Sequence, residues 1–162
     1  MNQKLEQLPL GKNTKRDFKN NDRVRPEWLF TFENKHQDVV YLVPFIQPDT
    51  TFRSYCPVTG QPDSASIEII YVPNVKMVES KSLKEYLQSF CNTGIGEFHE
   101  DCINRITKDL FDLMRPKYLR VFGDFVARGD LAIKPIVEIW GNYNIDQKER
   151  IERLVRMWDM KK

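Results

Sequence analysis

The chain has 162 residues, of which 41% are hydrophobic and 30% are charged, as in one soluble globular domain with a substantial core. A formal net charge of +2 is too small to indicate nucleic acid or an anionic membrane as the main partner. No apolar run approaches the ~20 residues of a membrane span, and the first residues lack the apolar segment of a signal peptide.

The first half of the chain predicts strands. Residues 1–25 are polar and have no sustained periodicity, so we expect an N-terminal arm rather than a separate domain. Aromatic residues alternate at positions 28, 30 and 32, which is typical of one face of a strand. Residues 39–45 predict a second strand, and residues 66–75 predict a third because apolar side chains recur at every second position.

The hydrophobic period then changes to that of helices. Ser82 and Glu85 have the spacing of a capping box, and apolar residues follow at helical spacing as far as Phe90. A second helix is expected from about residue 97 to residue 114, where Pro116 stops it. Both helices have one apolar stripe, so we expect both to pack against a sheet.

The last part of the chain predicts a hairpin and a C-terminal helix. Residues 118–128 and 131–140 form the hairpin, with its turn at residues 128–130, and Pro135 places its second strand at a sheet edge or a bulge. Asp146 and Glu149 are expected to cap a final helix within residues 141–162. Strands, two helices, strands and a helix predict an α+β fold, an antiparallel sheet with helices packed on one face.

The densest chemistry lies in residues 54–66, read SYCPVTGQPDSAS. Cys56 supplies a thiol and Asp63 a carboxylate, and the proline and glycine residues between them indicate a shaped loop that could aim both into a cleft. This is the arrangement that a nucleophile and a proton donor need. The alternative is a surface loop with an unreactive cysteine. Three cysteines and no CxxC pair favour free thiols in a reducing cytoplasm.

Three other segments carry polar side chains, and each has an ordinary explanation. Residues 78–84, read VESKSLK, could cradle a phosphate at a helix N-terminus or could simply cap the helix. Residues 98–102, read FHEDC, could bind a ligand, or their acids could only stabilise the helix dipole. Residues 128–130, read RGD, need no function at a hairpin tip. None of the three is specific in isolation.

Taken together, the segments are specific. CPVTGQPD, VESKSLKEYL, FHEDC and the ARGD turn closely resemble, in this order, the NADPH-dependent 7-cyano-7-deazaguanine reductases of queuosine biosynthesis, a tRNA modification pathway. The resemblance is to their short, single-module form and runs from about residue 10 to residue 140, whereas residues 1–9 and 141–162 carry no matching motif. It implies a single domain over residues 1–162 with a tunnelling fold similar to that of GTP cyclohydrolase I. It also implies a ring-shaped homo-oligomer with active sites between subunits.

The resemblance also implies roles for individual residues. Cys56 would add to the nitrile as a covalent thioimide, Asp63 would protonate the nitrogen, and NADPH would supply two hydrides. His99 and Glu100 would line the substrate pocket, with His99 also counted as catalytic, and Glu100 suits the donor edge of a guanine-like ring. The remaining expected contacts are to substrate from Val78, Glu79 and Ser80, and to NADPH from Ser80, Lys81, Arg128 and Gly129. No metal ion, nucleic acid or membrane is expected at the site.

Two other functions use the same residues. A zinc-dependent hydrolase of the same fold could use Cys56, His99 and Cys102 as metal ligands. A non-catalytic module could bind a purine-like ligand or RNA, and in it Cys56 would be unreactive. A further hypothesis is that mild oxidation joins Cys56 to Cys102 in a disulfide that protects the nucleophile; otherwise Cys102 is only a buried residue of the apolar stripe.

Overall fold

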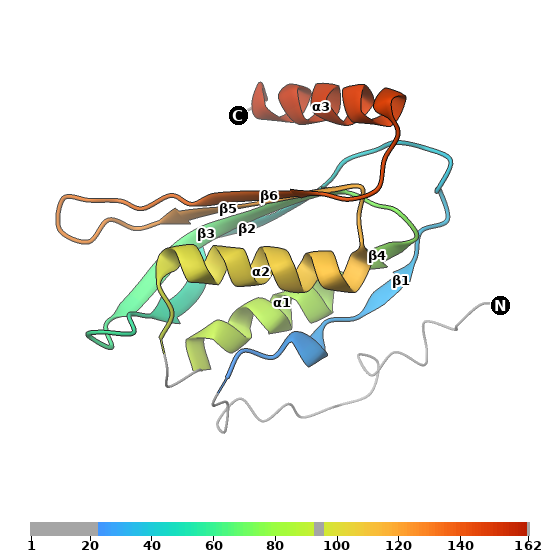
Figure 1. Ribbon diagram of the computed structural model, residues 1–162. Coiled ribbons are helices and arrows are strands. Elements are labelled where there is room, and N and C mark those ends of the chain that lie inside the picture. The colour runs from blue at the N-terminus through green and yellow to red at the C-terminus, as the bar shows by residue number, and fades with distance from the viewer. Residues whose placement is uncertain (1–22, 93–95, 162) are drawn as a thin grey trace.

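The computed structural model describes residues 23–92 and 96–161, so most of the predicted N-terminal arm lies outside the described residues. Four antiparallel strands form the main sheet in the order β2-β3-β5-β6; they are β2 (Val43–Tyr55), β3 (Pro62–Val72), β5 (Tyr118–Phe125) and β6 (Ile136–Trp140). Two short strands, β1 (Thr31–Glu33) and β4 (Lys76–Val78), pair with each other beside it. The helices are α1 (Ser80–Ser89), α2 (His99–Met114) and α3 (Ile145–Asp159). The α+β prediction is therefore confirmed (Figure 1).

The β2–β3 hairpin is longer and its connection shorter than the sequence indicates. β2 runs for 13 residues, because a bulge lets the strand continue past the polar residues after Gln47. Asp49 and Thr50 have φ of 53° and 49° there, and the register shifts between Gln47 and Phe52. The predicted 13-residue loop is thus wrong in extent: its middle is the turn, and Asp63 lies on β3, paired with Ser54.

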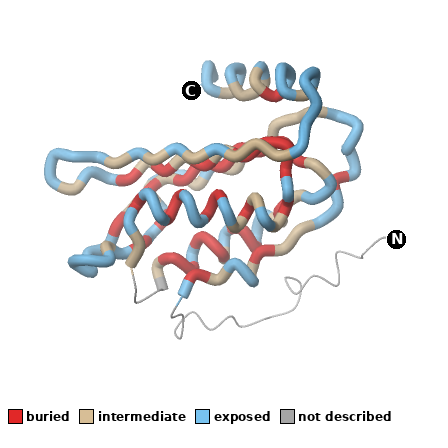
Figure 2. The backbone as a smooth tube through the Cα atoms, viewed as in Figure 1, coloured by how far each residue is buried: buried red, intermediate tan, exposed pale blue. Residues whose placement is uncertain are grey.

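Helices α1 and α2 cover one face of the sheet and enclose the main core (Figure 1). Figure 2 shows buried residues along the sides of both helices that face the strands. The start of α1 differs from the prediction, because the helix begins at Ser80 with Glu79 as its N-cap. The Ser82 hydroxyl instead lies inside the helix, where it donates to the Glu79 carbonyl at 2.8 Å and accepts from the Phe30 N–H at 3.0 Å. The predicted capping box at Ser82 and Glu85 is therefore wrong.

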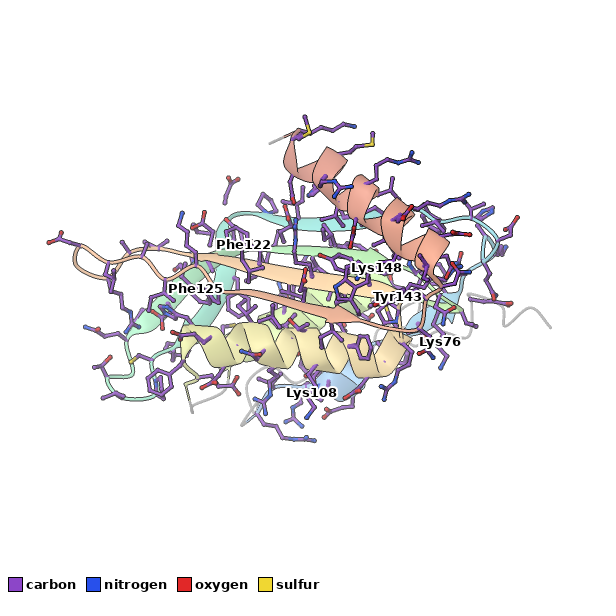
Figure 3. The ribbon with its side chains drawn as sticks, turned by 45° about the horizontal axis from the view of Figure 1, so that its top comes forward. Lys76, Lys108, Phe122, Phe125, Tyr143 and Lys148 are labelled. Carbon is purple, nitrogen blue, oxygen red and sulfur yellow. The ribbon has the colours of Figure 1, made fainter. Side chains whose placement is uncertain are left out.

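Helix α3 covers the opposite face of the sheet, so helices pack on both faces rather than on one (Figure 1). Its buried residue Ile151 belongs to a second core cluster with Ile70, Val72 and Tyr118. Side chains on β3 alternate between the two cores, which is why the strand shows an almost continuous apolar run. Tyr143 and Lys148 lie near one another at the start of α3 (Figure 3).

The N-cap of α3 is Asn144 in a capping box with Gln147, so the predicted caps Asp146 and Glu149 are wrong. At the other end of the helix, Arg120 from β5 binds the two carboxylate oxygens of Asp159 at 2.9 and 2.5 Å. This bidentate contact fastens α3 to the sheet.

The β5–β6 hairpin confirms the prediction, with shorter strands. β6 lies at the edge of the sheet, and the carbonyl of Pro135 accepts the N–H of Gly123 at 3.0 Å just before β6 begins. Beyond the strands, Arg128 and Leu131 form an isolated bridge that closes the tip, where Gly129 has φ of 61°. No helix in residues 23–92 and 96–161 is both long and apolar enough to cross a membrane.

Candidate active site

The turn between β2 and β3 holds Cys56 in a fixed position. The Cys56 N–H donates to the carbonyl of Gln61 at 2.9 Å, and the Gly60 N–H donates to the carbonyl of Cys56 at 2.9 Å. Gly60 has φ of 67°, a conformation that residues with a Cβ rarely adopt, so the turn requires glycine there. The sequence TG at positions 59–60 therefore shapes a tight turn that presents the half-buried Cys56 at its start.

The surroundings of Cys56 favour its thiolate. Hydrogen bonds from the Thr59 side chain, the Arg128 guanidinium and the backbone N–H groups of Thr59 and Val58 lower the pKa of the Cys56 thiol to about 6. Burial opposes this shift only weakly. With this lowered pKa the sulfur is largely ionised at neutral pH. The thiolate is the nucleophilic form, so Cys56 can attack an electrophile. The alternative of an unreactive surface cysteine does not fit these contacts.

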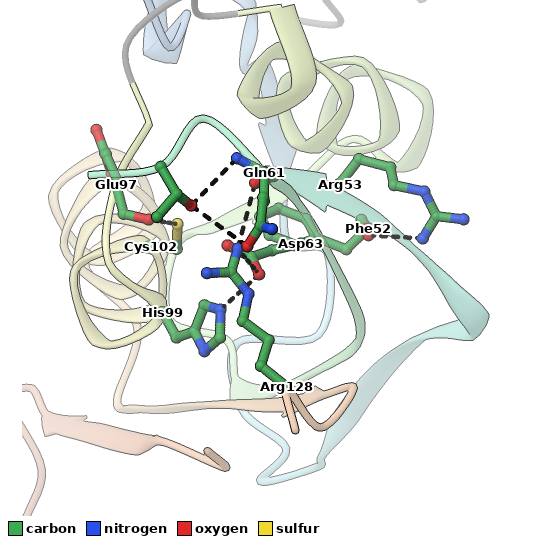
Figure 4. Close-up of polar contacts among 9 residues, drawn as sticks. Phe52, Arg53, Gln61, Asp63, Glu97, His99, Cys102 and Arg128 are labelled. Carbon is green, nitrogen blue, oxygen red and sulfur yellow. Dashed lines mark hydrogen bonds and ion pairs between the residues drawn. The ribbon is translucent and has the colours of Figure 1, made fainter. Parts of the chain in front are cut away.

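Asp63 is the buried centre of the site, with 4% of its surface exposed. Its Oδ1 lies 3.0 Å from Nε2 of His99 and also contacts the Arg128 guanidinium. Arg128 reaches further, because its NH2 group donates to the carbonyl of Gln61 at 3.2 Å. Figure 4 shows His99 and Arg128 converging on Asp63 from α2 and from the β5–β6 hairpin. One cation therefore links the carboxylate to the turn that carries Cys56.

The position of His99 is fixed by stacking and by the segment before α2. Its ring stacks on Phe125, near the end of β5 (Figure 3), with centroids 4.0 Å apart and an interplanar angle of 10°. Its Nδ1 is buried and has no hydrogen-bond partner among the described residues. Three residues earlier, the chain passes so close to β2 that a Cβ on Gly96 would lie 2.0 Å from the carbonyl oxygen of Tyr55. Gly96 thus allows α2 to begin beside the turn.

Cys102 lies one helical turn after His99 and is fully buried. Burial raises the pKa of the Cys102 thiol to about 12. Its Sγ lies 3.9 Å from the carbonyl oxygen of Glu97 (Figure 4). All three cysteines are free, so the structure has Cys102 as a neutral thiol of the core. A disulfide between Cys56 and Cys102 stays a prediction.

The other expected site residues are not gathered around Cys56 in this chain. The Val78 side chain is buried in the main core, and Glu79 accepts from the N–H groups of Lys81 and Ser82 at 2.9 and 2.7 Å as the cap of α1. The N–H groups of Lys81 and Ser82 therefore donate to a side chain of this chain, and phosphate binding at this helix end stays a prediction. Ser80 and Lys81 are exposed on the first turn of α1. That turn lies at the far end of the helix from the β2–β3 turn (Figure 1).

Two further expected residues are exposed near the site. Glu100 follows His99 on the first turn of α2, and its side chain faces solvent. Gly129 follows Arg128 at the hairpin tip, where a Cβ would meet no atom within 4 Å. Of the residues expected to contact NADPH, two have cationic side chains: Arg128, close to Cys56, and Lys81, on the first turn of α1.

Three residues of the site were not expected from the sequence. Thr59 contacts the sulfur of Cys56, Gln61 provides the carbonyl that holds both Cys56 and Arg128, and Phe125 supports the His99 ring. The first two stand inside the quoted CPVTGQPD motif, where their spacing from Cys56 was the available signal. Phe125 had none, because its contact with α2 depends on the tertiary packing of β5.

The zinc alternative gains no support from the arrangement. Cys56, His99 and Cys102 would have to converge on one ion, yet no group of three or more His, Cys, Asp or Glu in residues 23–92 and 96–161 is placed to hold a metal. His99 Nε2 faces Asp63 instead. The site therefore offers a thiolate, a carboxylate–imidazole pair and a guanidinium.

Known proteins resemble this chain over most of its length. A family model described as "QueF-like protein" matches residues 62–143, which include Asp63, His99 and Arg128. The chain is 52% identical over 134 residues to the NADPH-dependent 7-cyano-7-deazaguanine reductase of Neisseria meningitidis serogroup B, covering 83% of this chain and 82% of that protein. It is 51% identical over 135 residues to the reductase of the same name from Staphylococcus saprophyticus, covering 82% and 76%.

A solved structure has a related fold. The crystal structure of the archaeosine synthase QueF-Like in the apo form superimposes with a TM-score of 0.52 at 17% sequence identity, covering 64% of this chain and 96% of the other. At this identity the likeness concerns the fold alone.

Proposed function

Since the chain belongs to the QueF-like family, together with the NADPH-dependent 7-cyano-7-deazaguanine reductases, we propose that it reduces the nitrile of 7-cyano-7-deazaguanine. The product would be the primary amine 7-aminomethyl-7-deazaguanine, an intermediate of queuosine biosynthesis. The proposal rests on one observation. Asp63 contacts both His99 and Arg128, and Arg128 also acts on the Cys56 sulfur. A nucleophile, a proton source and a cation at one place are what nitrile reduction requires.

The reaction starts at the sulfur. The Cys56 thiolate attacks the electrophilic nitrile carbon, so a C–S bond forms and one π bond of the C≡N group breaks. Its electron pair goes to the nitrogen, which takes up a proton and becomes the N–H of a covalent thioimide. The groups that lower the pKa of the Cys56 thiol, Thr59 and Arg128 among them, favour this thiolate before the attack.

The proton for the nitrogen comes from the pair formed by Asp63 and His99. Their 3.0 Å contact joins Oδ1 to Nε2, so a proton on either atom is shared with the other. Burial of the pair keeps bulk water from competing for that proton. We propose that His99 shares the role of proton donor with Asp63 through this contact.

NADPH, when bound, supplies the two hydrides that the conversion of a nitrile to an amine requires. After the first hydride and a second proton have been added, the carbon carries sulfur, an amino nitrogen and hydrogen, and the C–S bond must break to leave a protonated imine for the second hydride. The electron pair of the C–S bond returns to Cys56, and the same contacts that favoured the attacking thiolate then favour the leaving one. We assign the phosphate contacts to Lys81, Ser80, Gly129 and Arg128, as the resemblance implies.

Substrate and cofactor contacts come from more than one subunit in our proposal. The segment Val78–Lys81 lies at the opposite end of α1 from Cys56, so within one chain it cannot reach the sulfur (Figure 1). Both outer strands of the main sheet, β2 and β6, have an unpaired edge among the described residues. A ring of subunits with a tunnelling fold, joined through these edges, would bring Val78, Glu79 and Ser80 of one copy to Cys56 of the next.

Two further proposals follow from the assignment. Free thiols at all three cysteines suit a reducing compartment, so we place the protein in the cytoplasm. The free base is the substrate, and we propose no direct contact with tRNA.

The proposal is tested by adding 7-cyano-7-deazaguanine to the purified protein and following NADPH absorbance. We expect two NADPH oxidised for each amine formed. Amine formation at any other ratio would contradict the proposed sequence of steps, and failure to oxidise NADPH would contradict the function.

A further inference from the structure

The side of α3 that faces away from the sheet carries a row of side chains that none of the roles above uses. The other side of the helix packs on the sheet through Ile151, with Val155 and Trp158 beside it. Residues three or four positions apart share one face of a helix, so the outward face holds a set that we call the outer stripe: Ile145, Glu149, Glu152, Arg153, Arg156 and Met160. All of these except Glu152 are exposed, and Figure 2 shows exposed residues along this side of α3.

The order of side chains in the outer stripe is complementary to its own reverse. From the N-terminal end of α3 the order is apolar, acid, acid, base, base, apolar. Two copies of α3 that run antiparallel about a two-fold axis between positions 152 and 153 place the acids at 149 and 152 opposite the bases at 156 and 153 of the other copy. In the same arrangement Ile145 faces Met160, and these two residues are 79% and 86% exposed. A two-fold contact uses the same surface on both copies, so each of these contacts occurs twice.

The charges of the outer stripe are not paired within the chain. Glu149 and Arg153 have the four-residue spacing of a helix ion pair, as do Glu152 and Arg156. Neither pair is formed, and the side chains of Glu149, Arg153 and Arg156 make no hydrogen bond or ion pair within residues 23–92 and 96–161. Glu152 has one long contact, 3.9 Å from Nζ of Lys148. Contacts inside α3 therefore leave these charges available to another molecule.

A groove lies along the same helix. It is formed between α3 and the segment before β2, and its volume is about 800 Å³. All four charged residues of the outer stripe line it, and Val39, Val40 and Leu154 add apolar surface. Val39 is 49% exposed, so part of this apolar surface is open to solvent. A recessed surface that is partly apolar and lined by both charges suits an element of a second protein chain.

The mixture of charges decides between classes of partner. A polyanion such as nucleic acid would meet the two glutamates of the outer stripe, with Asp38 and Asp146 at the same groove. A polycation would meet the two arginines of the stripe and Arg150 beside them. Both classes would bring like charges together, which costs affinity. The partner must present acids and bases in the opposite order along its surface, and α3 of a second copy does so.

We propose that the outer stripe of α3 is an interface with a second copy of this chain, in which two α3 helices pack antiparallel about a two-fold axis. The contact is separate from the edges of β2 and β6 and from the turn that holds Cys56, so the inference does not depend on the proposed function. One helix from each copy makes a small interface, so we expect separate chains to associate at roughly micromolar concentrations or above. Subunits that are already assembled should associate more tightly, because several helices then act together.

The test reverses charges one at a time and then together. Glu149→Arg and Arg156→Glu each place like charges opposite one another at both symmetric contacts, whereas the double variant restores opposite charges with their signs exchanged. The matched control is Lys108→Glu, because Lys108 is an exposed cation on α2 (Figure 3) and its reversal changes the net charge as Arg156→Glu does. Sedimentation equilibrium from micromolar to millimolar concentrations measures the association, and circular dichroism checks that each variant is folded.

In the wild type we expect an association that doubles the mass of the chain or of its assembled ring. Each single reversal should weaken it by ~10-fold or more, because both symmetric contacts change from attraction to repulsion. The double variant should recover most of the loss, and Lys108→Glu should match the wild type. Equal masses for the wild type and Glu149→Arg at every concentration would overturn the inference, as would an equal loss in Lys108→Glu or a double variant no better than the single ones. Binding of an added RNA oligonucleotide without self-association would assign the stripe to another partner.

A second measurement tests the antiparallel register. Ile145 and Met160 lie ~22 Å apart along one helix, so a disulfide between cysteines at these positions can form only between two copies. The variant that carries both Ile145→Cys and Met160→Cys should give a cross-linked dimer on mild oxidation, and peptide mapping should find the bond between positions 145 and 160. Each single variant should form no bond to its own counterpart, because the two-fold axis keeps identical positions equally far apart. A double variant without the bond between 145 and 160, or single variants that cross-link as well as it does, would overturn the proposed packing.

Discussion

Replacing Arg128 separates two roles for that side chain, as a contact for NADPH and as a part of the free site. In the absence of any ligand its guanidinium contacts Asp63, the carbonyl of Gln61 and the sulfur of Cys56. Arg128→Gln keeps the length and some hydrogen bonding but removes the charge. Arg128→Lys keeps the charge and loses the planar fork that can contact several acceptors together.

The magnitude follows from burial. Asp63 is 4% exposed, so water cannot replace the charged partner that the substitution removes. The Arg128 side chain is 36% exposed, so solvent partly screens its charge. Truncating one partner of a fully buried pair costs about 3–5 kcal/mol, and exposed pairs contribute about 0–1 kcal/mol. We therefore expect Arg128→Gln to lower the free energy of unfolding by ~1–2 kcal/mol, or roughly 2–8 °C in Tm for a chain of this size.

The assays are thermal unfolding and Cys56 alkylation, both without NADPH, followed by steady-state kinetics. Arg128→Gln should melt earlier, raise the midpoint of alkylation above pH 6 and lower kcat as well as raise the KM for NADPH. Arg128→Lys should recover more of the melting temperature than of the kcat. If both variants melt and alkylate like the wild type and differ only in the KM for NADPH, then Arg128 is a cofactor contact alone and our reading of the site is wrong.

Three further substitutions test other parts of the account. Gly96→Ala forces a Cβ against the Tyr55 carbonyl, so we expect ~1–3 kcal/mol lower stability in denaturant unfolding and reduced kcat; wild-type values for both would show that the close approach is absent. Asp63→Asn retains shape but transfers no proton, and turnover should fall ~10²-fold or more; a loss below threefold would assign the proton to another group. Arg120→Ala removes the bond to Asp159 on the α3 face, so thermal melting should show a lower Tm while kcat/KM per folded enzyme stays unchanged, and a loss of kcat would mean that α3 reaches the site.

The elements that periodicity specifies were predicted well from the sequence, and their ends were not. The apolar stripe of α2 and the alternation along β5 both follow from burial of one face. Caps depend on which nearby side chain the backbone turns towards, and several candidates stood within a few residues. Ser82 had the right spacing for a cap, but its hydroxyl is used inside α1, and Glu79 takes the position instead.

The candidate site was predictable where its residues share one short motif. Cys56 and Asp63 lie in one such run, and a tight turn brings them to one end of a hairpin. The contact of His99 with Asp63 joins residues 36 positions apart, and it depends on the packing of α2 against the sheet, which no local pattern encodes. For the same reason the sequence alone could not separate Arg128 as a partner of Asp63 from Arg128 as a cofactor contact.

The central claim is that the Cys56 thiolate forms a covalent bond to the nitrile carbon. Intact-protein mass spectrometry after incubation with 7-cyano-7-deazaguanine, without NADPH, tests it most directly. We predict that the wild-type chain gains the mass of one nitrile molecule, that peptide mapping places the addition on Cys56, and that adding NADPH removes it with release of the amine. Cys56→Ala should gain no mass while keeping the wild-type circular dichroism spectrum. An unmodified wild-type chain under these conditions, or equal modification of Cys56→Ala, would contradict the account.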